Sequence, residues 1–490
     1  MNARAVLRVN AGIVLAIGAS LLVPLAVSLV YGDGSWGSFL FPSLLMMASG
    51  VAVVYATRSS EDGRRTIEYV GTREIYFSVT LAWVLAALLG GVPFLVEGTF
   101  TSILDSSFEA MSGFTTTGST LLSDIEAESP SILFWRSMTQ WLGGIGIIVL
   151  LVAVAPALGS GAARLLGAEM SGLTQPRLTP RISDTAKTLV IVYASISIAQ
   201  TVALLVAGMN LYDAVVHTFA TVATGGFSPK TASIGHYDSV AIEAIVIFFM
   251  VVSGVSFSIY YLLYARRDPK TLLDRELLAY LATIAASVVL VWGILVFTGD
   301  YADDPADALR DSAFAVSSII TTTGFATADF DTWDASAKVV LVALMFVGGC
   351  AGSTAGGIKV VRLMIVLRTV GGDIFRMVHP RAVTSLRLGG TVIPEGVRLA
   401  VLALFAAWLI TFAVATVLVA LQPNLTVVSA ATAVAATLNV VGPGLGQVGA
   451  SESFEVVNSF GRFVLTVCML LGRLEIFTAL ALLSPAFWRR

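Results

Sequence analysis

Ten runs of about twenty mostly apolar residues divide this sequence, and they leave few folds open to it. A helix needs roughly 20 such residues to cross the hydrocarbon core of a bilayer. With 56% apolar and only 12% charged residues, the chain also has too few charges to cover the surface of a soluble globule. We therefore expect an all-α integral membrane protein with ten transmembrane helices. The expected spans are residues 11–31, 38–57, 75–97, 132–156, 188–208, 240–264, 277–298, 337–368, 397–421 and 460–486.

The first run follows Arg4 and Arg8, a charge pattern shared by secretory signal peptides and by first membrane spans. The apolar part of a signal peptide has about 7–15 residues and ends at a small-x-small cleavage motif. The run at 11–31 is longer and lacks that motif. We expect a retained span, with a cleaved signal peptide as the alternative.

Most of the 29 Lys and Arg residues fall on one side of the membrane if the ten spans alternate. The positive-inside rule assigns that side to the cytoplasm. We therefore expect a multi-pass protein of the cell inner (plasma) membrane with both termini cytoplasmic. The opposite loops are acidic, and their carboxylates are either solvated loop charges or a vestibule that concentrates cations.

Four loops on the acidic side are too apolar for ordinary loops and resemble one another. In the first, Asp105-Ser-Ser-Phe108 precedes Thr115-Thr-Thr-Gly118, and the third repeats this motif at the same spacing from Asp311 to Gly324. Weaker copies place Gly225 and Gly442 at the position of Gly118. The chain from about residue 75 is thus four copies of span, half-helix, turn and span. The expected units are two extra N-terminal helices at 1–72 and pore repeats at 73–186, 187–274, 275–394 and 395–490.

About ten helical residues cover only about 15 Å, so each half-helix must re-enter on its own side of the membrane. Its turn then lies at membrane depth, which is tolerated only where backbone is buried or lines a cavity. Four such turns around one axis form a ring of oxygens that can replace the hydration shell of a potassium-sized cation. Asp105, Asp213 and Asp311 are expected to cap the half-helices, with a cation site as the alternative reading.

The run 337–368 is longer than one membrane thickness and contains ten small residues, five of them glycine, from Gly348 to Gly357. A close-packed helix crossing is one interpretation. Five glycines exceed what packing requires, so we favour an unwound loop beneath the ring. Arg473 lies deep in the last span, where it either bonds the loop carbonyls or sets a positive barrier in the ion path. Glu475 does not share its helix face and is not its expected partner.

Several segments together resemble the membrane subunit of Trk-type potassium uptake systems, in the Trk/Ktr/HKT superfamily. The resemblance covers nearly the whole chain and implies its fold of four pseudo-fourfold membrane-pore-membrane repeats with re-entrant pore helices around one central pore. The fourth turn carries Asn439 one place before the position expected for it, so two registers fit there. The segments that carry the resemblance are Ser112–Ser119, Gln140–Ile148, Ala223–Ser228, Thr321–Ala328, His379–Ala382, Val441–Gly446 and Gly472–Phe477.

This resemblance implies a potassium-binding selectivity filter and a gate. A glycine at each filter position goes with potassium selectivity in the family. The implied filter residues are Thr116, Thr117, Gly118, Ala223, Thr224, Gly225, Thr322, Thr323, Gly324, Val440, Val441 and Gly442. The implied gate residues, in an intramembrane loop that obstructs the pore and beside it, are Gly348, Gly349, Gly352, Ser353, Thr354, Gly356, Gly357 and Arg473.

The implied function is potassium uptake through a selective, gated pore driven by the membrane potential. Potassium is the expected ion, with no organic cofactor. The implied partners are a second copy of the chain, the lipid bilayer and a cytoplasmic nucleotide-binding Trk regulatory subunit (an RCK-type ring), but no nucleic acid. Basic segments such as Arg376–Arg387 are broad enough to dock that ring, although ordinary positive-inside charge also explains them.

Two other classes of function fit the sequence less well. An ion-coupled secondary transporter, a potassium or sodium symporter or one for another small solute, is the alternative, but such proteins usually show two inverted halves rather than four copies. An enzyme is not expected, because no acid–base pair or nucleophile–histidine set occurs within the spans.

Overall fold

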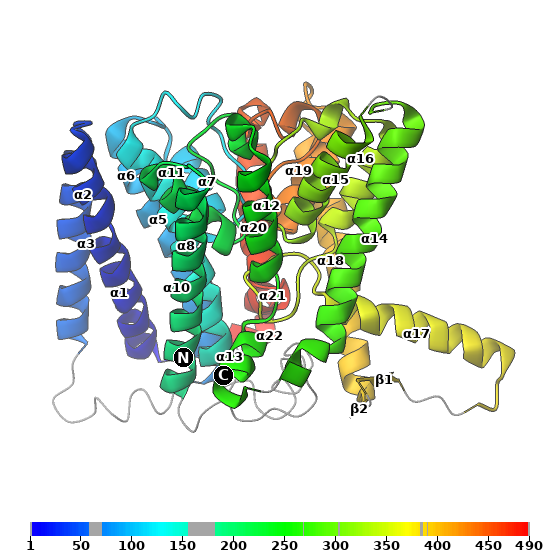
Figure 1. Ribbon diagram of the computed structural model, residues 1–490. Coiled ribbons are helices and arrows are strands. Elements are labelled where there is room, and N and C mark those ends of the chain that lie inside the picture. The colour runs from blue at the N-terminus through cyan, green and yellow to red at the C-terminus, as the bar shows by residue number, and fades with distance from the viewer. Residues whose placement is uncertain are drawn as a thin grey trace.

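The structure, a computed structural model, describes residues 2–57, 71–154, 182–267, 269–301, 304–382, 386–389 and 391–488. Within these residues the regular elements are helices, apart from a hairpin of β1 (Arg387–Leu388) and β2 (Thr391–Val392). Most long helices stand side by side in one slab (Figure 1). This arrangement agrees with the all-α membrane fold predicted from the apolar runs.

Three N-terminal helices form one edge of the slab: α1 (Ala3–Ser20), α2 (Leu22–Tyr31) and α3 (Trp36–Ala56). The side chain of Asn2 caps α1 by accepting a hydrogen bond from the Ala5 amide, and Gly32 ends α2 with a left-handed φ of 66°. α1 and α3 pack closely because Gly18 and Gly50 lie at their contact, where an added Cβ would strike the opposite helix.

Six helices among the described residues are long and apolar enough to cross a membrane. They contain most residues of the predicted runs 11–31, 38–57, 75–97, 188–208, 277–298 and 397–421. The helical stretches are Ala3–Tyr31, Trp36–Ala56, Arg73–Glu97, Lys187–Val206, Arg275–Thr298 and Glu395–Ala420. The last four of these stretches are formed by α5 (Thr72–Gly90) with α6 (Val92–Glu97), by α10 (Ile182–Val206), by α14 (Arg275–Thr298) and by α18 (Glu395–Ala420). A further long helix is α8 (Pro130–Val154). The end of run 132–156 lies outside the described residues.

The predicted single helix at 240–264 is wrong. α12 (Val240–Ser253) and α13 (Phe257–Arg266) meet at a bend of 87°. Backbone groups freed at the bend bond to the glycine-rich segment instead: the Gly254 carbonyl accepts from the Cys350 amide at 2.9 Å, and the Phe257 amide donates to the Gly352 carbonyl at 3.0 Å. The helix breaks because these bonds replace its own.

Two other runs are also interrupted. Run 460–486 forms α20 (Ser459–Arg473), α21 (Phe477–Leu483) and α22 (Pro485–Trp488), with left-handed φ angles of 57° and 56° at Glu475 and Ile476. Run 337–368 forms α16 (Ala335–Met345) and α17 (Val360–Val378), separated by a non-helical segment at 346–359. α17 extends outward from the lower part of the slab (Figure 1).

Four short helices follow the pattern of the predicted half-helices. They are α7 (Ile103–Phe114), α11 (Leu211–Val222), α15 (Pro305–Ile320) and α19 (Val427–Leu438). Their N-terminal amides are capped by the side chains of Ser102, Asn210, Asp304 and Thr426. The described residues also form five short 3-10 helices, at Ser233–Tyr237, Pro269–Leu273, Phe330–Thr332, Gly446–Val448 and Phe454–Val456.

The prediction that Asp105, Asp213 and Asp311 cap these helices is wrong, because other side chains make the capping bonds. Asp105 and Asp213 do lie in the first turn of their helices, and Asp311 lies farther along α15. Asp105 forms an ion pair with Arg462 at 2.7 Å. Asp213 and Asp311 accept hydrogen bonds from tyrosine hydroxyls at 2.7 Å. These carboxylates therefore join the short helices to their neighbours.

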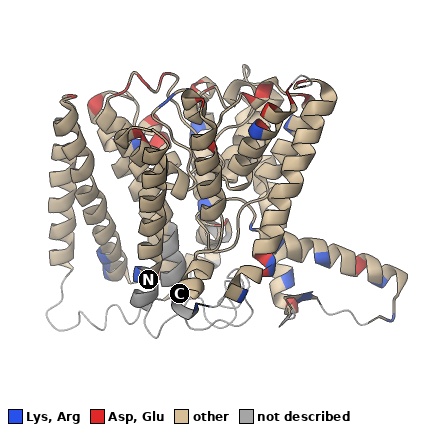
Figure 2. Cartoon of the chain, viewed as in Figure 1, with Lys and Arg blue, Asp and Glu red and all other residues tan. Residues whose placement is uncertain are grey.

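Charges separate between the two ends of the slab. Figure 2 shows acidic side chains gathered at the upper end and most basic side chains at the lower end. Such a division is typical of a membrane protein whose lower end faces the cytoplasm.

Candidate ion-conduction site

Each of the four short helices ends in the same type of turn. Two residues past each helix, the backbone takes a left-handed φ: 58° at Thr116, 55° at Thr224, 56° at Thr322 and 60° at Val440. In each turn, the amide of the next residue donates at 2.8 Å to a carbonyl five residues back in the helix. We call residues 115–118, 223–226, 321–324 and 439–442 the four filter segments.

Glycine completes each filter segment. The φ angles at Gly118, Gly226, Gly324 and Gly442 are 88°, 79°, 82° and 108°. A side chain there would be strained, and it would also have no room. A Cβ added at any of the four would strike the carbonyl oxygen that precedes the glycine of the next segment.

These contacts close into a ring. Gly118 lies against the carbonyl of Gly225, Gly226 against that of Thr323, and Gly324 against that of Val441. Gly442 in turn lies against the Thr117 carbonyl, and the Ser119 hydroxyl donates to the Gly442 carbonyl at 2.8 Å. The four segments, far apart in sequence, therefore surround one axis.

The predicted alignment of the second segment is wrong by one residue. α11 ends at Val222, so the residue that matches Gly118 in position and φ is Gly226, not Gly225. Ala223 then matches Thr115, just before the left-handed residue. The sequence offers two adjacent glycines, and only the end of the helix decides between them. In the fourth segment, Val440-Val441-Gly442 has the same register as the first and third segments.

The threonine hydroxyls of the ring differ in their hydrogen bonding. Thr117 and Thr323 share hydrogen bonds of 2.8 Å with Thr115 and Thr321. The Thr116 hydroxyl oxygen is buried and has no hydrogen-bond partner among the described residues. Backbone carbonyls and hydroxyls are the oxygens that suit an alkali cation. Elsewhere in the described chain no cluster of His, Cys, Asp and Glu could hold a metal ion.

A glutamine in α8 holds the second filter segment. The Gln140 amide nitrogen Nε2 donates to the Gly225 carbonyl at 2.6 Å, and its Oε1 accepts from the Phe227 amide at 3.0 Å. Gln140 is completely buried. It lies in a segment that carried the family resemblance, but this role could not be predicted from the sequence.

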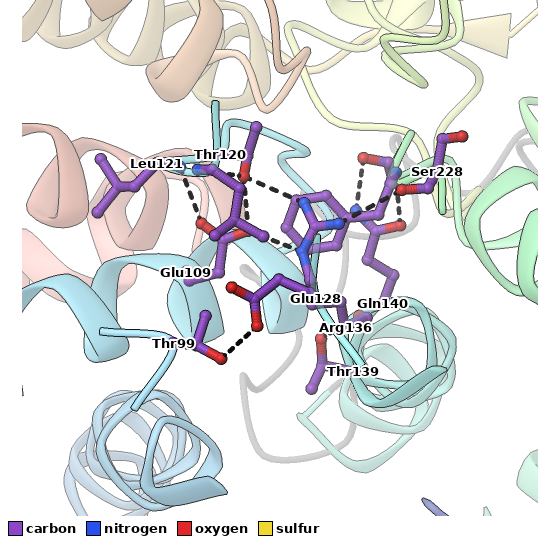
Figure 3. Close-up of polar contacts among 12 residues, drawn as sticks. Thr99, Glu109, Thr120, Leu121, Glu128, Arg136, Thr139, Gln140 and Ser228 are labelled. Carbon is purple, nitrogen blue, oxygen red and sulfur yellow. Dashed lines mark hydrogen bonds and ion pairs between the residues drawn. The ribbon is translucent and has the colours of Figure 1, made fainter. Parts of the chain in front are cut away.

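A buried ion pair lies behind the first two segments (Figure 3). Arg136 Nε and Glu109 Oε1 are 2.9 Å apart, and both side chains are buried. Glu109 also accepts from the Thr120 hydroxyl at 2.8 Å and from the Leu121 amide at 3.0 Å. Arg136 reaches the Ser228 carbonyl at 3.3 Å and stacks 4.1 Å from the centroid of the Phe227 ring.

This pair connects α7 and α8 to the chain that leaves two filter segments. Neither Arg136 nor Glu109 was expected from the sequence to have a role in the site. The signal was available, because two opposite charges inside apolar helices of one repeat are expected to pair.

The glycine-rich segment, Gly348–Gly357, contacts the ring directly. The Gly356 amide donates to the Thr322 hydroxyl at 2.6 Å, and a Cβ at Gly356 would strike Val440. The Thr354 hydroxyl lies 3.1 Å from the Val222 carbonyl at the end of α11 and 3.2 Å from that of Ser253. The segment thus contacts the ends of three of the four short helices.

The glycine-rich segment is also held by buried charges. Arg473 is buried and donates to the Thr354 carbonyl at 2.8 Å and to the Gly143 carbonyl of α8 at 3.3 Å. Lys359 Nζ donates to the Ala355 carbonyl. Glu276 Oε1 accepts from the Ala351 amide at 2.7 Å. These bonds make Arg473 a bridge between the segment and α8.

Glu475 pairs with Arg362 at 2.5 Å and not with Arg473. This outcome agrees with the analysis of helix faces. The ion pair joins the break after α20 to the first turn of α17. The sequence did not indicate Arg362 as the partner, because the two residues are far apart in the chain.

Comparisons with known proteins agree with one another. A family model described as "TrkH: Cation transport protein" matches residues 46–490. Proteins named Trk system potassium uptake protein TrkH, from Halomonas elongata and from Escherichia coli K12, are each 37% identical to the chain over the full length of both. The crystal structure of the potassium transporter TrkH from Vibrio parahaemolyticus matches all of both chains with a TM-score of 0.90 and 36% identity.

Proposed function

The chain belongs to the TrkH family of cation transport proteins, and from this premise we propose that it takes up potassium across the cell membrane through one gated pore. It is a transporter and not an enzyme. The observation that carries the proposal is the closed ring of four filter segments, because a ring of backbone oxygens suits a dehydrated potassium ion. The membrane potential supplies about 2.3 kcal/mol per charge per 100 mV, so no chemical coupling is required.

Potassium binds at the filter segments in this proposal. The C-terminal ends of the four short helices carry the negative ends of their dipoles, which favour a cation. The left-handed residues and glycines set the carbonyl directions that a ring of ligands needs. The proposed potassium-binding residues are Thr116, Thr117, Gly118, Thr224, Gly225, Gly226, Thr322, Thr323, Gly324, Val440, Val441 and Gly442.

The proposed architecture has ten spans, of which the last eight form four pseudo-fourfold pore repeats behind an N-terminal pair. The interrupted runs count as spans here. Both termini lie in the cytoplasm of a multi-pass inner-membrane protein. The separation of charges between the two ends of the slab supports this orientation.

The proposed gate is the glycine-rich segment together with Arg473. Its contacts with Thr322, Val222 and Val440 support a closed position directly beneath the ring. Opening moves the segment and the guanidinium together. A homodimer and a cytoplasmic nucleotide-binding regulatory ring complete the proposed assembly.

Ion-coupled secondary transport is not favoured. Transporters of that kind usually bind substrate between two inverted halves. Four equivalent turns that contact one another in a closed cycle support a central pore instead.

Ion flux into liposomes tests the proposed function. Purified protein is reconstituted, and tracer potassium and sodium uptake are measured under an imposed potential. We expect potassium uptake to follow the potential and to exceed sodium uptake. Accumulation far beyond the electrical equilibrium, or equal uptake of the two ions, would contradict a passive potassium-selective pore.

A further inference from the structure

A basic pocket lies on the lower side of the slab, away from the filter and gate. It has a volume of about 210 Å³ and lies between α17, the β1–β2 hairpin and the start of α18. Four arginines line it together with Thr369, Gly372 and Leu386. These arginines are Arg368, Arg376, Arg387 and Arg398. A single water accounts for about 30 Å³ in the liquid, so the pocket has room for a much larger group.

Two of the four arginines form ion pairs at the edge of the pocket. Arg376 pairs with Asp373 at 2.8 Å, and Arg398 pairs with Glu395 at 3.1 Å and lies 4.0 Å from Asp373. In the described part of the chain, two carboxylates thus lie beside Arg376 and Arg398. The carboxylates are also the more exposed partners, with 56% and 76% of their side-chain surface accessible. The residues that line the pocket bring four guanidinium groups and no carboxylate to its wall.

Two hydrogen-bond donors of the pocket arginines have no acceptor among the described residues. The Nε atoms of Arg376 and Arg398 are buried, and neither has a hydrogen-bond partner among the described residues. A guanidinium presents Nε and one Nη as a fork that matches two oxygens of a phosphate or a carboxylate. The chemistry of the pocket thus fits an oxyanion that accepts from several arginines at once.

The position of the pocket indicates which kind of phosphate compound can reach it. Arg398 lies in the first turn of α18, a helix long and apolar enough to cross the membrane. The pocket therefore lies at the level where the hydrocarbon core ends and lipid headgroups begin. α17 beside it exposes apolar side chains, including Val370, Ile374 and Met377, which suit contact with acyl chains. Basic pockets in this position are known to suit anionic headgroups.

We propose that the pocket binds the phosphate of an anionic phospholipid headgroup from the leaflet that faces the basic side. The phosphate chemistry is shared with free phosphate and soluble phosphate esters. The location at the end of a spanning helix and the apolar surface of α17 favour the lipid. A bound headgroup joins α17, which follows the glycine-rich segment directly, to the start of α18.

Native mass spectrometry of the full chain tests this assignment. Protein is released from micelles that contain phosphatidylcholine and phosphatidylglycerol, and retained phosphatidylglycerol is counted. We expect retention by the unmodified protein and loss of retention in R376Q/R398Q. The matched control R4Q/R8Q removes two positive charges from α1 and should keep the lipid. Unchanged retention in R376Q/R398Q, or equal loss in the control, would overturn the proposal.

A second variant covers the case in which R376Q/R398Q does not fold. D373N removes the carboxylate that competes for both arginines, so retained phosphatidylglycerol should increase. No increase in a folded D373N protein would count against the site.

Inorganic phosphate distinguishes the source of the ligand. If millimolar phosphate displaces the retained lipid and raises the melting temperature as much as phosphatidylglycerol does, a soluble phosphate is the ligand and the lipid assignment is wrong. If R376Q/R398Q retains the lipid but no longer binds the regulatory ring, the pocket is a protein-docking surface and the proposal also fails. Lipid retention that resists millimolar phosphate supports the proposal.

Discussion

Arg136 and Glu109 form a buried ion pair, 2.9 Å apart, directly behind two of the four filter segments. The pair holds the chain that leaves the first segment through Thr120 and Leu121, and the chain that leaves the second through Ser228. Its position makes the geometry of the ring depend on a charge–charge contact between α7 and α8, behind the filter segments.

Glu109→Gln should lower discrimination between potassium and sodium. The substitution leaves the Arg136 charge buried without its partner, which typically costs about 3–5 kcal/mol. Ratios of tracer uptake in liposomes measure the effect. The matched control is Asp105→Asn, which breaks the Arg462 ion pair nearer the start of the same helix. An unchanged ratio in a folded Glu109→Gln protein would show that the pair supports stability alone.

Gly226→Ser should damage selectivity as strongly as Gly118→Ser, and more than Gly225→Ser. Gly118 and Gly226 have left-handed φ angles and no space for a Cβ beside the next segment. A non-glycine residue in that backbone region costs about 1–2 kcal/mol. The three atoms nearest to a Cβ added at Gly225 belong to the end of the Gln140 side chain, which can shift more readily than a backbone carbonyl. Potassium-to-sodium permeability ratios check the order, and a larger effect at Gly225 would restore the register expected from the sequence.

Arg473→Ala should raise basal potassium flux in the absence of the regulatory ring. A positive charge about 4 Å from a potassium ion costs about 4 kcal/mol at an effective dielectric near 20, close to three factors of ten in occupancy. Arg473→Lys keeps the charge and alters the bonds to Thr354 and Gly143. If both variants raise the flux, the hydrogen bonds of Arg473 form the barrier. If only Arg473→Ala raises it, the positive charge forms the barrier. No increase in either would place the gate elsewhere.

Thr354→Val should also raise basal flux while leaving selectivity intact. The hydroxyl links the glycine-rich segment to the Val222 and Ser253 carbonyls, and valine has nearly the same shape without the donor. The lost bond is worth about 0.5–1.5 kcal/mol, so a flux increase of several-fold is expected. Tracer uptake by the membrane subunit alone measures it, and a loss of selectivity instead would mean that the segment supports the filter.

The sequence predicted the membrane class, the four turns and the glycine-rich break, because each has a local signature. Apolar length identifies a span, and the repeated Thr-Thr-Thr-Gly motif identifies a turn. The bend between α12 and α13 has no such signature. It follows from hydrogen bonds to Cys350 and Gly352, which come from a segment about a hundred residues away.

The register of the second filter segment could not be read from the chain for a similar reason. Gly225 and Gly226 are adjacent glycines, so the sequence alone does not show which of them matches Gly118. The end of α11 at Val222 determines that it is Gly226. The partners of Glu109 and Glu475 likewise depend on how helices pack. Sequence spacing indicates which ion pairs can form within one helix, but not which arginine of another helix packs against a given carboxylate.

Crystals soaked in rubidium or thallium salts test the central claim most directly. Both ions substitute for potassium and are located by their anomalous scattering. The account predicts density on the axis enclosed by the four filter segments, near the oxygens of Thr117, Gly225, Thr323 and Val441, and its loss when sodium replaces the heavier ion. Ordered density outside the ring, with none on that axis, would contradict a single potassium pore formed by these segments.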